Sequence, residues 1–227
     1  MEKIIAFSNR TESRDKFTKA LQYGSKLLSW VYIYKNRLYH KRFNDLYVLT
    51  RDSRKVFKLF RTLQETKNIL DKIKDLLWKK EKIPIVLDIL SRLGFMIYWV
   101  FDNLVILNRL KLIQSDNINT ISYWSHFGWV VAIFWSLLKN IYELISILNN
   151  PNYTKQDNLG NETKINRKEE IINHLINILG NMGDMLPASS GIFLPEKLVG
   201  YPLSDGIAAL GGLISAIIQI RDLWKSC

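Results

Sequence analysis

RDSRKVFKLFRTLQETKNILDKIKDLLW, residues 51–78, is the segment from which the fold class follows. Its apolar side chains recur mostly at steps of three, four or seven residues, at Val56, Leu59, Phe60, Leu63, Leu70, Ile73 and Leu77. At about 100° per residue, this spacing places them on one side of a helix, whereas a strand would alternate them between two faces. The segment therefore predicts one continuous amphipathic helix.

Basic side chains accompany this apolar stripe. Arg54, Lys58 and Arg61 lie on the opposite face, while Lys67 and Lys74 lie within the stripe. Long lysine stems can cover apolar surface and keep their ammonium groups in water. Cations on one side with Phe and Leu on the other are typical of a helix that lies in a membrane interface. A helix packed in an ordinary bundle has the same pattern, so both interpretations stay open on this segment alone.

The charge of the chain is concentrated beside this helix. Residues 1–92 hold 22 Lys and Arg against 10 Asp and Glu, and the remaining residues hold 10 against 11. The whole net charge of +11 therefore comes from the N-terminal part. Such a block suggests an anionic partner, either phospholipid headgroups or nucleic acid. The single cysteine, Cys227, excludes an intrachain disulfide.

The rest of the chain predicts further helices, which we expect at residues 9–31, 38–47, 85–113, 121–138, 171–186 and 204–224. Segment 121–138 has 18 residues without an acid or base except His126, and it is the best candidate to span a membrane, although a buried core helix also fits. The apolar part of segment 85–113 is interrupted by Asp102 and Asn103, and we expect it to be too short and too polar for a simple span. Residues 187–202 are rich in turn formers.

These elements predict an all-α, membrane-associated protein with amphipathic N-terminal helices and one to three membrane-embedded hydrophobic helices. We expect one domain over residues 1–227 with four parts. They are a basic amphipathic region (1–84), central hydrophobic helices (85–148), a polar loop (149–170), which is Asn-rich, and C-terminal helices with a packing face of small residues (171–227).

Two polar or small-residue patterns are candidates for a role inside the bundle. Ala208, Gly212 and Ser215 recur at steps of three or four residues, which permits close approach of a second helix. Asp102 and Asn103 form a polar pair within an apolar helix. They are either a polar contact between helices or part of the wall of a water-filled path.

Catalytic and metal-binding patterns are absent from the sequence. His40, His126 and His174 lie far apart without ligand partners at helical spacing, and no glycine loop has the spacing that cradles a phosphate. Cys227 has no base beside it to activate it. We therefore expect no enzymatic activity, no cofactor and no metal.

Five groups of residues occur in a suggestive order. They are Arg14-Asp15-Lys16 with Gln22-Tyr23-Gly24 and Trp30; Arg54-Lys55 with Lys58-Leu59 and Arg61; Arg92-Leu93-Gly94-Phe95 with Tyr98 and Asp102-Asn103-Leu104; Asp184-Met185-Leu186-Pro187; and Leu203-Ser204-Asp205-Gly206 with Gly211-Gly212-Leu213-Ile214-Ser215. In this order they resemble the motifs of the peroxin-11 family of peroxisomal membrane proteins, nearly from end to end.

This resemblance implies a protein that elongates the peroxisomal membrane and promotes proliferation and division of the organelle. Family members hold both termini in the cytosol, self-associate and meet the fission machinery. Their amphipathic helix inserts into the cytosolic leaflet, which here corresponds to the apolar set of segment 51–78. The residues expected to contact anionic phospholipid headgroups are Arg54, Lys55, Lys58, Arg61, Lys67 and Lys74.

Two other functions stay open from the sequence. The family resemblance also suggests a metabolite-conducting channel with Asp102 and Asn103 near its wall. Composition alone permits a soluble helical nucleic-acid binder, but the resemblance favours a membrane and no nucleic acid as the partner.

Overall fold

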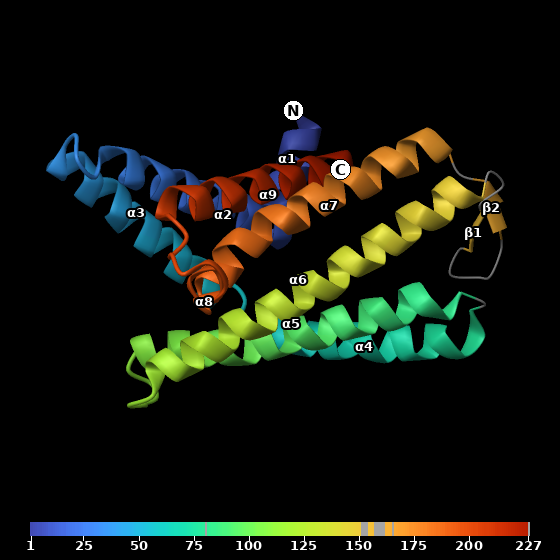
Figure 1. Ribbon diagram of the computed structural model, residues 1–227, viewed down its shortest axis with the longest axis horizontal. Coiled ribbons are helices and arrows are strands. Elements are labelled where there is room, and N and C mark those ends of the chain that lie inside the picture. Colours follow the sequence, from blue (N-terminus) through green and yellow to red (C-terminus); the bar gives the residue numbers. More distant parts are fainter. Residues whose placement is uncertain (80, 151–153, 157–161, 165, 227) are drawn as a thin grey trace.

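The computed structural model describes residues 1–79, 81–150, 154–156, 162–164 and 166–226. The helices are α1 (Glu2–Asn9), α2 (Thr11–Tyr32), α3 (Arg37–Val56), α4 (Arg61–Trp78), α5 (Lys82–Arg109), α6 (Ile118–Asn149), α7 (Arg167–Ser190), α8 (Leu194–Val199) and α9 (Asp205–Lys225) (Figure 1). Two short strands, β1 (Thr154–Gln156) and β2 (Glu162–Lys164), pair antiparallel within the predicted polar loop, much of which lies outside the described residues. The predicted all-α class is confirmed.

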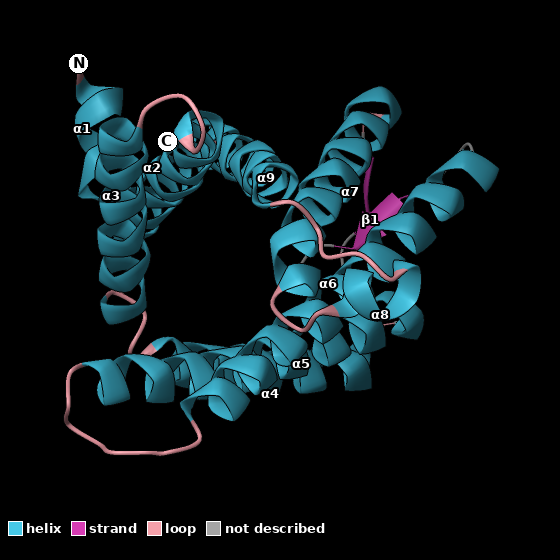
Figure 2. Cartoon of the chain, turned by 60° about the vertical axis from the view of Figure 1, so that its left-hand side comes forward, coloured by secondary structure: helices cyan, strands magenta, loops and turns pink. Residues whose placement is uncertain are grey.

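The helices pack side by side around an open centre and form a ring. α5 packs against α6, α6 against α7, α7 against α9, and α9 against α2. α3 lies on α2, α4 lies on α5, and α3 meets α5 where these two sides of the ring join (Figure 2). The two ends of the chain meet, because the rings of Phe7 and Trp224 lie 5.5 Å apart and the Arg10 guanidinium donates hydrogen bonds to Ser226 at 2.9 and 3.0 Å.

Close backbone approach joins α7 to α9. A Cβ added at Gly183 would lie 2.6 Å from the backbone oxygen of Gly211, so neither position has room for a side chain. Ala208, Gly212 and Ser215 lie in the same buried region of α9, and the ring of Tyr23 in α2 packs directly on Gly212. The structure thus places the predicted small-residue face of this helix between α2 and α7.

The N-terminal helix α2 turns its polar face inward. Asp15 and Lys19 are buried, whereas Phe17, Leu21 and Leu28 are exposed on the outside. A soluble bundle has the opposite arrangement, since burial of apolar surface drives folding in water. The outside of the ring is therefore matched to apolar surroundings.

Within the part of the chain that the structure describes, three helices are long and apolar enough to cross a membrane, namely α5, α6 and α9. α5 was expected to fall short of a span, but it starts at Lys82, runs unbroken over 28 residues and stays apolar enough despite the charged side chains within it. Pro84 does not prevent this start, because a proline in the first turn removes no intrahelical hydrogen bond. α7 likewise extends past the predicted segment 171–186, through Pro187 to Ser190.

The prediction of one continuous helix over residues 51–78 is wrong. α3 ends at Val56 and α4 begins at Arg61, with turns at Phe57–Phe60, which we call the linker. The backbone oxygen of Leu59 accepts a hydrogen bond from the Asn103 side chain at 2.8 Å, and Lys58 pairs with Asp15. These tertiary contacts hold the linker in a turned conformation.

Candidate membrane-facing surface and polar interior

The apolar stripe of segment 51–78 lies on the outer surface despite the break. Phe60 is 79% exposed and Leu77 is 73% exposed, while Leu59 is half-buried. The other predicted members are also exposed, namely Val56, Leu63, Leu70 and Ile73. A contiguous apolar surface of this kind marks a site of contact with a partner or a membrane.

The inner face of α4 rests on α5. Arg92 donates to Glu65 at 3.0 Å, and Lys72 pairs with Asp88 at 3.7 Å. Within α4 only Glu65 and Ile69 are buried. α4 runs beside α5 as one arm of an antiparallel hairpin, so its apolar stripe continues the outer surface of the ring (Figure 1).

The cations predicted to meet lipid headgroups fall into two groups. Lys67 and Lys74 are exposed on α4. Four others face the interior and pair with carboxylates instead: Arg54 and Lys58 with Asp15, both at 3.0 Å, Lys55 with Asp102, and Arg61 with Glu12 at 3.6 Å. In this conformation these four cations therefore do not point to lipid. Their polar face is turned into the bundle because the outside of the bundle is apolar.

The carboxylate of Asp15 joins the linker to α2. Burial acts to raise the pKa of the Asp15 carboxyl, but Lys58 and Arg54 outweigh burial and hold this pKa well below its usual value. Burial, with the charge of Arg54, lowers the pKa of the Lys58 ammonium well below its usual value, although Asp15 opposes this. Because Lys16 also lies 3.9 Å from Asp15, one carboxylate serves three cations.

The two residues of the polar pair in α5 have different surroundings. Asn103 binds the linker backbone, which makes it a contact between elements. Asp102 is 4% exposed, pairs with Lys55 and lines an inner cavity.

This inner cavity, of about 350 Å³, is lined by residues of α2 to α7, of the linker and of α9. Its wall includes nine Lys and Arg residues and three carboxylates. At the α2–α9 side, Lys19 Nζ donates to Ser215 Oγ at 2.9 Å and lies 2.7 Å from Asp184, while Gln219 Nε2 donates to Asp184 at 3.2 Å. The cavity is therefore a polar, positively charged space enclosed by helices with apolar outer faces.

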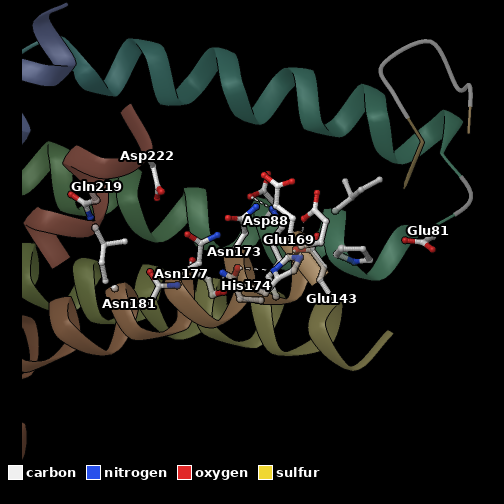
Figure 3. Close-up of a pocket in the computed structure, with 18 of the residues that line it drawn as sticks. Glu81, Asp88, Glu143, Glu169, Asn173, His174, Asn177, Asn181, Gln219 and Asp222 are labelled. Atoms are coloured by element: carbon white, nitrogen blue, oxygen red, sulfur yellow. Dashed lines mark hydrogen bonds and ion pairs between the residues drawn. The ribbon is translucent and has the colours of Figure 1, made fainter. Parts of the chain in front are cut away.

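A second, larger cavity of about 880 Å³ lies between α5, α6, α7 and α9. Figure 3 shows three asparagines of α7 directed toward it, Asn173, Asn177 and Asn181. Asn181 donates to Ser136 Oγ of α6 at 2.9 Å. Gln219 lines both cavities, so the two polar spaces meet at this residue.

Sequence reasoning missed the interior members of this site, namely Asp15, Lys19, Asp184 and Gln219. Two pairs did carry a signal, since Asp15 with Lys19 and Ser215 with Gln219 follow a four-residue step and so share one face of a helix. Asp184 has no such partner, because its contacts come from other helices.

The family model described as Peroxisomal biogenesis factor 11 (PEX11) matches residues 1–224. The chain belongs to the PEX11 family. It is 26% identical to the peroxisomal membrane protein 11 homolog of Dictyostelium discoideum, over 99% of this chain and 94% of that protein. It is also 26% identical to the peroxisomal membrane protein PMP30B of Candida boidinii, with the same coverage. The peroxisomal membrane protein 11B of Arabidopsis thaliana is 25% identical, over 100% and 98% of the two chains. No solved structure matches the chain.

Membership of the PEX11 family confirms the resemblance found in the sequence motifs. It identifies a peroxisomal membrane protein and implies a role in peroxisome proliferation. The matched PEX11-family relatives are named as membrane proteins. The apolar helices α5, α6 and α9 agree with that location.

Proposed function

We propose that the protein promotes elongation and division of peroxisomes by inserting the apolar face of α4 into the cytosolic leaflet. The observation that carries this proposal is the exposed apolar stripe of the linker and α4. Side chains that enter one leaflet expand it relative to the other and favour positive curvature. Lys67 and Lys74 lie exposed on the same helix, and each cation near an anionic surface contributes about 1 kcal/mol.

Insertion parallel to the membrane plane requires α4 to leave α5, since the two helices run side by side. This step opens a small interface, in which Glu65 and Ile69 are the buried residues of α4. The linker stays attached to the bundle through Lys58 and Asn103. We propose that α4 acts as an arm fixed at the linker.

A pair of charge insertions tests this role of α4. We expect Leu63→Glu with Leu70→Glu to shorten peroxisomes in cells, because each change removes about 1.5–3 kcal/mol of apolar transfer free energy and adds a charge. Gln64→Glu with Thr66→Glu is the matched control, since both residues are exposed on the same helix and the pair of changes adds the same two charges. Organelle length, measured at equal protein levels, is the readout. Normal elongation by the double variant would exclude α4 as the inserting element.

We also propose that both termini lie in the cytosol. α5, α6, α7 and α9 pack in succession as antiparallel neighbours, so four crossings return the chain to its starting side. α7 is too polar to count as a span by composition. Its asparagines line a cavity, whereas Ile172, Leu175 and Leu179 are exposed on its outer face, so the face that would meet lipid is apolar. An impermeant maleimide should label Cys227 on intact organelles. Labelling only after permeabilisation would contradict this topology.

Conduction of metabolites is a second candidate function, favoured by the two polar cavities that meet at Gln219. Reconstitution in planar bilayers tests it. We expect a conductance that Asp102→Ala changes, because Asp102 lines the inner cavity. Absence of conductance, or no effect of this substitution, would argue against a pore. Self-association, contact with the fission machinery and the four-part division of the domain remain proposals from the resemblance.

A further inference from the structure

The wall of the inner cavity carries more positive charge than its own carboxylates neutralise. Nine Lys and Arg residues line the cavity, against Glu65, Asp102 and Asp184. The cations come from α2, α3, the linker, α4 and α5, so separate elements direct charge to one space. Charge gathered in this way attracts anions, because low-dielectric walls focus the field.

Carboxylates outside the cavity pair with some of these cations, but they do not neutralise the whole excess of positive charge. Glu12, Asp15, Asp52 and Asp205 pair with lining cations from outside the cavity. Arg92 in turn pairs with Glu65. Counting all of these groups, ten cations stand against seven carboxylates, an excess of three positive charges.

Two hydrogen-bond donors of the wall also lack an acceptor. The indole Nε1 of Trp99 and the guanidinium Nε of Arg61 are buried and have no hydrogen-bond partner among the described residues. Trp99 is 7% exposed, and both residues line the cavity. A buried donor without an acceptor costs about 1–3 kcal/mol, so an acceptor in the cavity would stabilise the site.

We infer that the inner cavity is a binding site for a multiply charged, phosphate-bearing anion. The charge excess and the free N–H donors both call for an acceptor-only, anionic group. Arg51 donates to Asp52, and Arg54 donates to Asp15 and Gln22, so these guanidiniums can offer phosphate oxygens only the N–H groups that those bonds do not use, and the lysines add point charges. The phosphate belongs either to a soluble anion or to a phospholipid headgroup that enters between helices. The inference concerns the closed ring, in which Arg61 and Glu65 of α4 form part of the cavity wall.

Calorimetric titration of the full-length protein with inorganic diphosphate tests this site. The protein is placed in nanodiscs of phosphatidylcholine, and in a second set that also contains a phosphoinositide. We expect saturable binding of one diphosphate per chain in the phosphatidylcholine discs. Undiminished binding in the second set assigns the site to a soluble anion, whereas loss of binding there assigns it to a lipid headgroup. Absence of binding in both sets overturns the inference.

Three variants locate the binding in the cavity. Lys16→Gln removes a lining cation and should weaken diphosphate binding about tenfold. Asp102→Asn removes a lining carboxylate and should strengthen binding by a similar factor, a gain that a damaged fold would not produce. Lys41→Gln is the control, because Lys41 is exposed and lies outside the cavity wall. Equal weakening by Lys16→Gln and Lys41→Gln, or weaker binding by an Asp102→Asn protein that melts at the wild-type temperature, would place any binding on the surface and overturn the inference.

Discussion

Replacement of Asp15 by Asn tests whether the linker is held by buried ion pairs. The Asp15 carboxylate is 5% exposed and lies 3.0 Å from both Arg54 Nε and Lys58 Nζ. The amide of Asn has the same shape but no charge, so the variant leaves these cations buried without their counter-ion. The linker is then expected to separate from α2.

The size of the effect follows from the burial of this cluster. Removing one partner of a buried ion pair costs about 3–5 kcal/mol, because the remaining charge stays desolvated and unpaired. Since 1.4 kcal/mol is a factor of ten, the population with an open linker should rise about 100-fold to 1,000-fold or more. The remaining contact of Asn103 with Leu59 limits the opening to the turn around Lys58.

Limited trypsin digestion of the full-length protein in detergent measures this opening. Trypsin cleaves after lysine and arginine, and Lys58 is 8% exposed in the closed linker. Cleavage after Lys58 should accelerate about 100-fold or more, since it follows the open population when opening is fast. Asp71→Asn is the matched control, because Asp71 and its partner Lys74 are exposed on α4. A cleavage rate within about twofold of the wild type in Asp15→Asn would refute the role of the cluster.

Three further outcomes are expected. Gly183→Val should lower the unfolding free energy by about 1–3 kcal/mol or more in a detergent melt, because the valine side chain meets the α9 backbone. Gly24→Ala should raise the unfolding free energy slightly, because Gly24 is helical and has free space around it. Burial lowers the pKa of Lys19 to about 8 from 10.5, so the unfolded chain binds more protons between these values and stability should rise with pH across that window. Lys19→Met should reduce this rise in melting temperature, and the lowered pKa values of Lys16 and Lys58 account for the part that stays. Arg92→Gln removes the ion pair with Glu65 and should lengthen peroxisomes by freeing α4, and unchanged or shorter organelles would contradict the arm.

The helices were predictable where periodicity and local signals agree. Segment 204–224 carries a serine cap and small residues at steps of three or four, and α9 follows it within one residue at each end, with Ser204 accepting a hydrogen bond from the Ile207 N–H. The apolar stripe of α4 was equally visible, because exposed Leu and Ile at helical spacing need no tertiary information to be recognised.

The break at the linker could not be read from the sequence. Val56 and Leu63 are seven residues apart, so the apolar period runs through the turn without interruption, and no glycine or proline marks it. The turn depends on Lys58 and Leu59 meeting residues that are more than 40 positions away in the chain. Such contacts form only in the folded ring, so local sequence patterns do not reveal them.

The direction of the polar faces was the second limit. In a soluble bundle the charged face of an amphipathic helix points outward to water. In a bundle surrounded by lipid the apolar face can point outward instead, and the charged face then points to the interior. Lys55 and Arg54 follow the inward choice because Asp102 and Asp15 lie opposite them. Periodicity identifies the charged face of a helix but does not say whether that face points to the interior or to the outside of the bundle.

The contacts of the linker and α4 differ in strength, and this difference decides which part can move to lipid. Opening the linker separates Lys58 from Asp15, and a buried charge that is left without its partner in this way costs up to about 3–5 kcal/mol. An anionic surface returns about 1 kcal/mol per cation, which is less than the pairs provide. Releasing α4 costs the burial of Ile69, about 1.5–3 kcal/mol, and part-exposed ion pairs of about 0–1 kcal/mol each. The membrane therefore draws out α4 before the linker, and Lys67 and Lys74 become the headgroup contacts while the inward cations keep the arm attached.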